Sequence, residues 1–208
     1  MNFDNFILVF CNGVPPPGER LRQLVRKPRL VVCADGGAQK AVASGYTPDL
    51  IVGDLDSLEN PNDPHGKAEI VRVPSQNNTD FEKTLDVMLS RGMNNFLVTS
   101  FSGGRIDQTL ANLQITFEYA GKCRIVLADE EYIIIPVTGV LEETLPADTI
   151  ISLIAMRDDT VVTTDGLAFE LRDEVLPKGG HGVSNRSLKE TVKIEVHGGG
   201  ILVLIKDV

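Results

Sequence analysis

With 208 residues, 42% of them hydrophobic and 24% charged, the chain has the composition of a globular protein with one large domain or two small ones. Its 29 acidic side chains outnumber the 20 basic ones and give a formal net charge of -9, the wrong sign for tracking a nucleic-acid backbone. No apolar segment approaches the length that spans a bilayer, so neither nucleic acid nor a membrane is an expected partner.

The cysteines and the first residues indicate a cytoplasmic protein. Cys11, Cys33 and Cys123 are an odd number, lie far apart and form no CxxC pair, which argues against a disulfide framework or a zinc site. We interpret Cys11 and Cys33, which end apolar runs, as small buried hydrophobes. The opening sequence MNFDNFILVFCNG has no basic leader, and its apolar run is too short for a signal peptide.

Short apolar runs alternate with helical patterns over the first 129 residues. The runs are mostly continuous in apolar character, which is typical of buried parallel strands. They cover residues 6–11, 29–34, 49–53, 69–73, 95–100 and 124–128. Strands that alternate with helices predict an α/β fold with a doubly wound, mostly parallel, Rossmann-like sheet.

Two of the intervening helices have clear sequence signals. The first runs from Asp80 to about Arg91 and begins with the capping-box pattern Thr79-Asp80-Phe81-Glu82. The second spans about Ile106 to Ala120, with Gly121 as its stop. By helical spacing, the apolar face of the first helix contains Phe81, Leu85, Met88 and Leu89. The apolar face of the second helix contains Ile106, Leu110, Leu113 and Phe117.

The pattern changes after Asp129. Strand-like runs follow one another with turn signals and without a convincing helix, namely YIIIPV, TIISLIAM, TVVTT, LAFEL, TVKIEV and ILVLIK. These runs predict a C-terminal all-β sandwich. We therefore expect two domains, residues 1–129 and residues 130–208.

Polar residues and glycines follow four of the predicted parallel strands. They are Asn12-Gly13, Asp35-Gly36-Gly37, Asp54 with Asp56, and Ser102-Gly103-Gly104-Arg105 with Asp107. Each alone is compatible with a simple turn. Because the carboxyl ends of parallel strands meet at one edge, where open α/β sheets bind ligands, the four together favour a binding site.

Asp54 and Asp56 have the spacing of a divalent-cation site. If residues 54–56 stay extended, both carboxylates point the same way while Leu55 turns into the protein. Magnesium prefers a few carboxylates together with waters and substrate phosphates. A turn with two solvated aspartates is the alternative interpretation.

A phosphate-binding segment is expected after the fifth strand. The chain has no Walker A motif, because Glu19 stands where lysine belongs, and no GxGxxG follows a strand. The backbone amides of Gly103 and Gly104, at the start of the helix from Ile106, are suited to phosphate instead. The guanidinium of Arg105 would add further N–H donors to the phosphate.

Five segments, in order, resemble the motif set of the thiamin pyrophosphokinase (thiamin diphosphokinase) family. They are ADGGA at 34–38, PDLIVGDLDSL at 48–58, TDFEKTL at 79–85, GGRIDQTLANL at 103–113 and GVSN at 182–185. The resemblance runs nearly end to end and implies an α/β domain followed by a β-sandwich. It implies that the hydroxyl of thiamin attacks the β-phosphorus of ATP, so that thiamin diphosphate forms and AMP leaves.

The resemblance also implies roles for individual residues of the first domain. Asp54 and Asp56 would hold Mg2+, and Asp80 would complete the acidic cluster, with helix capping as its alternative role. Asp35 would be a further catalytic residue in the active-site cleft. The implied ATP site contains Gly103, Gly104, Arg105, Asp107, Gln108 and Asn112.

The second domain is implied to bind thiamin and to form a homodimer in which each sandwich contributes to the partner's active site. Thiamin has a thiazolium cation and an aromatic pyrimidine, which call for acidic and stacking groups. The implied thiamin-binding residues are Gln76, Phe169, Ser184 and Asn185. Phe169 stands where a tryptophan is familiar in relatives, and a core strand position is an equally good interpretation of it.

Two other functions are compatible with the acidic residues. One is a magnesium-dependent pyrophosphokinase or phosphohydrolase acting on another alcohol or nucleotide. The other is a non-catalytic nucleotide sensor whose sandwich docks a partner protein.

Overall fold

The structure is a computed structural model that describes residues 1–54, 67–75 and 77–206. It divides into two compact units. The first unit is Met1–Ile115 with Lys122–Glu130, and the second is Thr116–Gly121 with Glu131–Val208. The domain limits predicted from the sequence, with ATP in the first and thiamin in the second, stay a prediction. Among the described residues, no helix combines the length and apolarity needed to cross a membrane.

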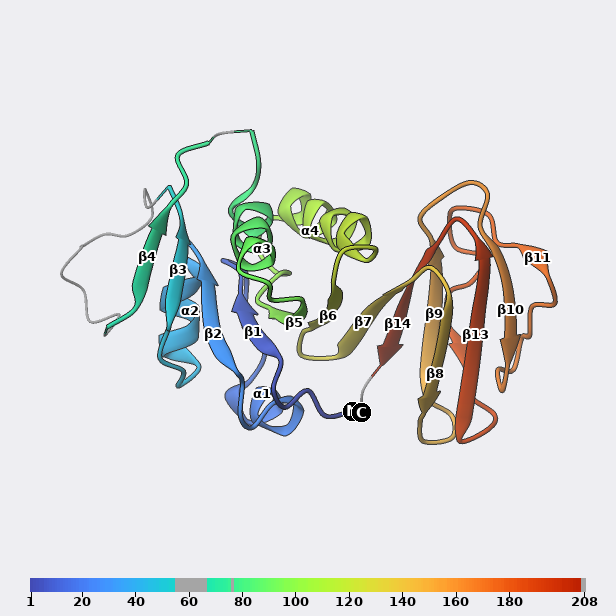
Figure 1. Cartoon of the computed structure of the whole chain (residues 1–208). Helices are drawn as coiled ribbons and strands as arrows, with labels where there is room; N and C mark the ends of the chain where they lie inside the picture. The colour runs from blue at the N-terminus through green and yellow to red at the C-terminus, as the bar shows by residue number, and fades with distance from the viewer. Residues whose placement is uncertain (55–66, 76, 207–208) are drawn as a thin grey trace. The chain divides into compact units, whose positions relative to one another are not determined.

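The first unit is built on a parallel sheet (Figure 1). Its strands are β1 (Ile7–Phe10), β2 (Leu30–Ala34), β3 (Leu50–Gly53), β4 (Glu69–Arg72), β5 (Asn95–Thr99) and β6 (Arg124–Ala128). They lie in the order β6-β5-β1-β2-β3-β4, and every pair is parallel. The predicted doubly wound α/β sheet is therefore confirmed.

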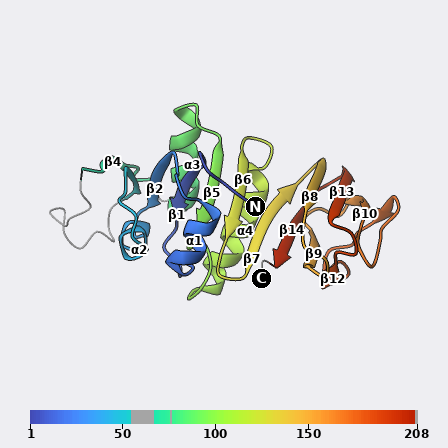
Figure 2. The same cartoon turned by 90° about the horizontal axis from the view of Figure 1, so that it is seen from below.

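The helices cover both faces of this sheet. They are α1 (Gly18–Leu24), α2 (Gly37–Ala43), α3 (Asp80–Ser90) and α4 (Ile106–Tyr119). The connections β1-α1-β2 and β2-α2-β3 cross the sheet toward β4. The connections β4-α3-β5 and β5-α4-β6 cross it in the opposite direction, toward β6. Since such crossovers are right-handed, the two pairs lie on opposite faces (Figures 1 and 2).

The central strands are buried, but β4 is not. Every residue of β1 and β3 is buried, as continuous apolar runs predict. In β4, by contrast, most side chains are exposed, including Ile70 at 49%. The prediction of a buried strand is wrong here, because among the described strands β4 lies at the edge of the sheet and pairs with β3 alone.

Helix α3 confirms the sequence prediction, and α4 corrects part of it. Thr79 Oγ1 accepts from the Glu82 N–H, and the Glu82 carboxylate accepts from the Thr79 N–H at 2.9 Å, so the capping box is formed. In α4 the predicted apolar face is wrong in its first half, where Ile106 and Leu110 are 72% and 57% exposed. Polar Asn112 is buried in that part of the helix instead.

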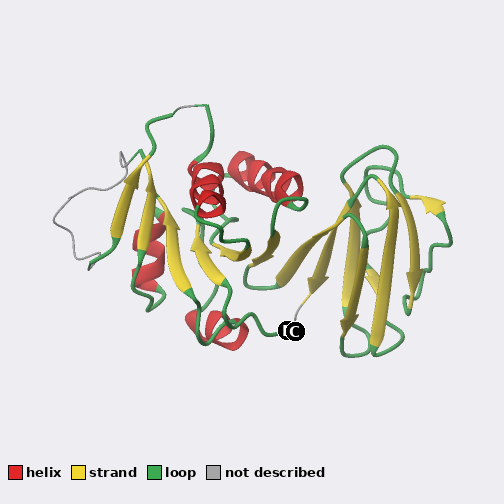
Figure 3. Cartoon of the chain, viewed as in Figure 1, coloured by secondary structure: helices red, strands yellow, loops and turns green. Residues whose placement is uncertain are grey.

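The second unit is an antiparallel sandwich of two sheets (Figure 3). Its strands are β7 (Tyr132–Val137), β8 (Val140–Thr144), β9 (Ile150–Ala155), β10 (Val161–Asp165), β11 (Glu174–Val175), β12 (Asn185–Arg186), β13 (Thr191–Gly198) and β14 (Ile201–Lys206). Within this unit the sheet orders are β12-β9-β14-β7 and β11-β10-β13-β8. Ile151 and Val203 of one sheet share a core with Val162 and Ile194 of the other, all at most 1% exposed. The predicted sandwich is confirmed.

The loop from Leu167 to Leu171 is the main error of the strand prediction. Its sequence LAFEL reads as a strand, but only Leu167 forms a bridge, with Ser187, and Phe169 is 75% exposed. The segment follows Gly166, whose φ of +89° turns the chain out of the sheet. β8, with the sequence VLEET, was not predicted because its alternating half-exposed residues include few apolar ones.

Candidate active site

The loops after β1 and β5 meet at the carboxyl edge of the parallel sheet. β1 lies between β5 and β2, so the winding direction reverses there, and ligands of open α/β sheets bind at such a point. The Gly13 N–H donates to the Ser100 carbonyl at 2.6 Å, and the Val14 N–H donates to the Ser102 carbonyl at 2.8 Å. Only glycine fits at position 13, because a Cβ there would lie 2.2 Å from the Ser102 carbonyl oxygen.

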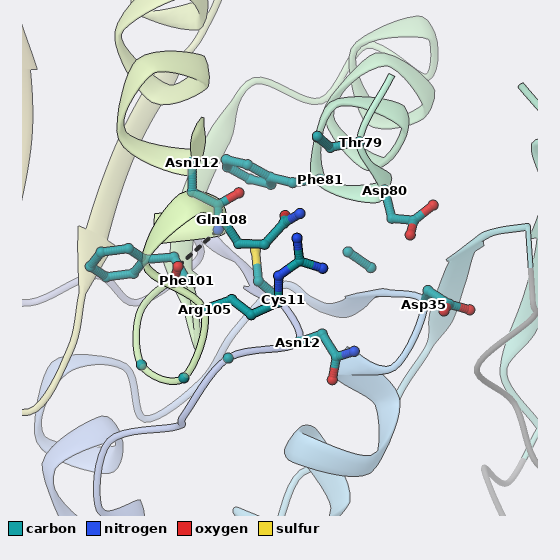
Figure 4. A pocket seen from close by; sticks show the side chains of 14 residues that line it. Cys11, Asn12, Asp35, Thr79, Asp80, Phe81, Phe101, Arg105, Gln108 and Asn112 are labelled. Carbon is teal, nitrogen blue, oxygen red and sulfur yellow. Dashed lines mark hydrogen bonds between the residues drawn. The ribbon is translucent and has the colours of Figure 1, made fainter. Parts of the chain in front are cut away.

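A cavity of about 400 Å³ opens at this edge, which is within the usual size range of small-molecule sites. Its walls come from the segments that follow β1, β2 and β5, from the start of α3 and from α4 (Figure 4). The lining residues are Cys11, Asn12, Gly13, Ala34, Asp35, Thr79, Asp80, Phe81, Phe101, Gly103, Gly104, Arg105, Gln108 and Asn112.

Three carboxylates gather at one side of this pocket. Oxygens of Asp35, Asp54 and Asp80 all lie within 4.8 Å of one another. Asp35 follows β2 in a left-handed conformation with φ of +42°, and its N–H donates to the Val52 carbonyl at 2.8 Å. Asp54 follows β3, and Asp80 opens α3. Residues far apart in the sequence therefore supply one acidic cluster.

The acidic cluster fits a divalent cation of the magnesium type. Asp35 is 4% exposed, and its buried Oδ1 has no hydrogen-bond partner in the part of the chain that the structure describes. The side chains of Asp54 and Asp80 are 19% and 33% exposed. Buried oxygens without donors beside solvent-accessible carboxylates are a suitable ligand set for a hard cation that keeps several waters. The predicted ligand Asp56 lies outside the described residues.

Lys83 is a buried charged residue beside the acidic cluster that the sequence prediction missed. Its side chain is 3% exposed, with Nζ 2.9 Å from Asp80 Oδ1 and 3.8 Å from Asp54 Oδ2. Burial alone would lower the pKa of Lys83, but the hydrogen bond to Asp80 and the charges of Asp80, Asp54 and Asp35 outweigh it and raise the pKa. The only sequence signal was its position three residues after Asp80, on the same side of the helix.

The predicted ATP-binding residues mostly line the pocket. Gly103 and Gly104 have φ of +85° and +78°, a conformation that turns the chain ahead of α4. Arg105 and Gln108 follow them on the pocket wall. Asp107 is not among the lining residues. It accepts hydrogen bonds from Arg105 Nε and Nη2, which lower the pKa of Asp107.

Asn112 and Cys11 also line the pocket, and both side chains are buried. Asn112 is 7% exposed, and its Nδ2 donates to the Phe101 carbonyl at 2.8 Å, so it braces the loop after β5 (Figure 4). Burial, with the neighbouring Cys33, raises the pKa of the Cys11 thiol. A thiol that stays protonated contributes an apolar wall and no nucleophile, in agreement with the interpretation from the sequence.

The residues implied to bind thiamin lie in the second unit, apart from Gln76, which is outside the described residues. Asn185 is 6% exposed, and its side chain pairs with both polar groups of the Phe169 backbone. Its Oδ1 accepts from the Phe169 N–H at 3.0 Å, and its Nδ2 donates to the Phe169 carbonyl at 2.7 Å. Ser184 is exposed, with φ of +62°. Asn185 therefore holds the loop that presents the exposed Phe169 ring, which is a role the sequence did not indicate.

The α/β sheet, the acidic cluster and the glycine-rich loop together fit the class of metal-assisted, nucleotide-dependent transferases. Comparison with known proteins specifies the class further. The sequence profile described as "Thiamin pyrophosphokinase, catalytic domain" matches residues 21–127. A second profile, "Thiamin pyrophosphokinase, vitamin B1 binding domain", matches residues 140–201.

Relatives and solved structures agree with these profiles. Thiamine pyrophosphokinase 1 from Oryza sativa subsp. japonica is 29% identical over 201 residues, covering 80% of this chain and 75% of its own. In fold, thiamin pyrophosphokinase from Candida albicans is similar with a TM-score of 0.81 at 21% identity, covering 99% of this chain and 93% of its own. Thiamine pyrophosphokinase from Bacillus subtilis is similar with a TM-score of 0.80 at 18% identity, covering 96% of this chain and 98% of its own.

The chain belongs to the thiamin pyrophosphokinase family. Its activity is accordingly the ATP-dependent synthesis of thiamin diphosphate, and the resemblance recognised in the five motifs is confirmed.

Proposed function

We propose that the first unit's pocket binds ATP with Mg2+ and that the diphosphoryl group passes there to the hydroxyl of thiamin, releasing AMP. The observation that carries this assignment is the convergence of Asp35, Asp54 and Asp80 beside a cavity lined by Gly103, Gly104 and Arg105. Diphosphoryl transfer demands mainly alignment of two substrates and neutralisation of phosphate charge.

The acidic cluster is the proposed metal site. Asp54, Asp56 and Asp80 would hold the ion, with Asp35 beside them. Bound Mg2+ supplies charge neutralisation on the phosphate oxygens. The chain's own groups bind the phosphates through the Gly103 and Gly104 backbone and the Arg105 guanidinium. Phe81 and Phe101, each 3% exposed, give the pocket an apolar part of its wall.

The second unit is the proposed thiamin-binding part. Phe169, 75% exposed on a loop held by Asn185, offers an aromatic face to the thiazolium or the pyrimidine. We propose a homodimer in which this loop completes the active site of the partner chain. We also propose a cytoplasmic location, which is supported by three cysteines that form no disulfide in the described chain.

The Phe169 ring is expected to contribute to thiamin affinity. Phe169→Ala should raise the KM for thiamin roughly 3- to 30-fold, the value of one stacking or cation–π contact, without changing the KM for ATP. Steady-state kinetics with each substrate varied in turn measures both. Val175→Ala, which removes another exposed apolar side chain of the same unit, is the control. A thiamin KM equal to that of the unaltered enzyme would contradict the proposed contact.

The reaction itself is tested by its products. With thiamin, ATP and Mg2+, the protein should release AMP and thiamin diphosphate in equal amounts, and AMP should not form without thiamin. Separation of nucleotides and thiamin phosphates by chromatography measures this directly. Thiamin monophosphate with ADP would indicate an ordinary kinase. AMP without thiamin would indicate a phosphohydrolase, and bound ATP without any AMP would indicate a nucleotide sensor.

A further inference from the structure

Lys83 places a buried positive charge beside the three carboxylates of the acidic cluster. Its Nζ is 2.9 Å from Asp80 Oδ1 and 3.8 Å from Asp54 Oδ2, and its side chain is 3% exposed. Lys83 is not among the residues that line the pocket. The ammonium therefore lies beside the carboxylates and outside the lining of the pocket.

The start of α3 does not need the contact between Lys83 and Asp80. Thr79 and Glu82 already form a complete capping box there. A buried ion pair is, in addition, weak evidence for stability, because desolvation of both charges opposes their attraction. The position of Lys83 is better explained by the charge of the cluster. Three carboxylates within 4.8 Å of one another repel, and one fixed ammonium offsets part of that repulsion.

We propose that Lys83 is a resident counter-ion of the acidic cluster that weakens the binding of a free divalent cation, so that the metal enters together with the phosphates of ATP. The inference rests on the proposed function, which places the metal at this cluster with Asp54, Asp56 and Asp80 as its ligands and Asp35 beside them. A cation held by these carboxylates lies near Nζ, since two of them are within 4 Å of it, and the two positive charges repel. Phosphate oxygens add the negative charge that compensates for this repulsion.

The affinity for Mn2+ in the absence of nucleotide tests the proposal, with Mn2+ standing in for Mg2+ as a cation that prefers the same oxygen ligands. Lys83→Met should bind Mn2+ at least about 10-fold more tightly than the unaltered protein, as measured by electron paramagnetic resonance titration. Mn2+ should also raise the Tm of Lys83→Met by more than it raises the Tm of the unaltered protein. Lys83→Arg, which keeps the charge, should bind Mn2+ like the unaltered protein.

Arg91→Met is the matched control. It removes a cation from the end of the same helix, where Arg91 pairs with the exposed Glu69, and should leave the Mn2+ affinity unchanged. Lys83→Gln replaces Lys83→Met if circular dichroism shows that the latter does not fold.

The possible results separate the inference from the proposed function. Mn2+ bound by the unaltered protein but no more tightly by either neutral variant would overturn the counter-ion role alone. The same holds if Lys83→Arg binds Mn2+ as tightly as Lys83→Met, because charge would not be the cause. If the unaltered protein binds Mn2+ neither alone nor with ATP, the metal assignment in the proposed function fails as well.

Discussion

Asp54→Asn is expected to lower the rate of thiamin-dependent AMP formation at least about 100-fold, the scale of losing one electrostatic contact to the transition state. The substitution removes a carboxylate charge from the acidic cluster at the point where β3 ends. The protein should stay folded, because Lys83 keeps its 2.9 Å hydrogen bond to Asp80. A product assay and far-UV circular dichroism measure the two effects.

Asp86→Asn is the control for this substitution. Asp86 is a carboxylate on the exposed side of α3, six residues after Asp80, and its loss should leave the rate unchanged. AMP formation by Asp54→Asn at a rate close to that of Asp86→Asn would remove Asp54 from the proposed metal site.

Gly53→Ala is expected to disturb the acidic cluster through packing alone. A Cβ at position 53 would lie 2.8 Å from Asp35 Cβ and 3.1 Å from Asp35 Oδ1. Because Asp35 is buried and held by the Val52 carbonyl, it can yield only by moving its backbone. The free energy of unfolding should fall by about 1–3 kcal/mol, as in other overpacked sites. Activity should fall by about tenfold or more, since the displaced carboxylate leaves the cluster.

Denaturant unfolding and the product assay are the two measurements for Gly53→Ala. Gly139→Ala is the matched control, because a Cβ at position 139 meets no atom within 4 Å. If Gly53→Ala lost stability but kept full activity, the position of Asp35 would not matter for the reaction.

The convergence of Asp35, Asp54 and Asp80 could be foreseen in part. Asp35 and Asp54 directly follow strands whose continuous apolar character predicts parallel pairing, and parallel strands place such residues at one edge. Asp80 was harder to place, since it belongs to a helix start and its distance from the strand ends depends on how α3 packs. Only the resemblance to the family connected it with the other two.

The burial and the hydrogen-bond partners of Lys83, Asn112 and Asn185 could not be predicted, although the motifs had named Asn112 and Asn185 as site residues. Each of the three is at most 7% exposed in the structure. The partners that satisfy them are Asp80, the Phe101 carbonyl and the Phe169 backbone, and the last two lie 11 and 16 residues away. No local pattern encodes these last two pairs, because burial of a polar group is decided by the partner that folding brings to it.

The sequence by itself determined the fold class of both parts, the capping box of α3 and the edge at which the site lies. These features depend on local periodicity and on short-range hydrogen bonds. Only the tertiary structure decided that Leu167–Leu171 is a loop presenting Phe169 and that the first half of α4 buries Asn112 in place of Ile106. It also decided that the ammonium of Lys83 lies beside the acidic cluster. These features depend on contacts between different segments. The energy of such a contact depends on both segments together and cannot be predicted from the sequence of either one alone.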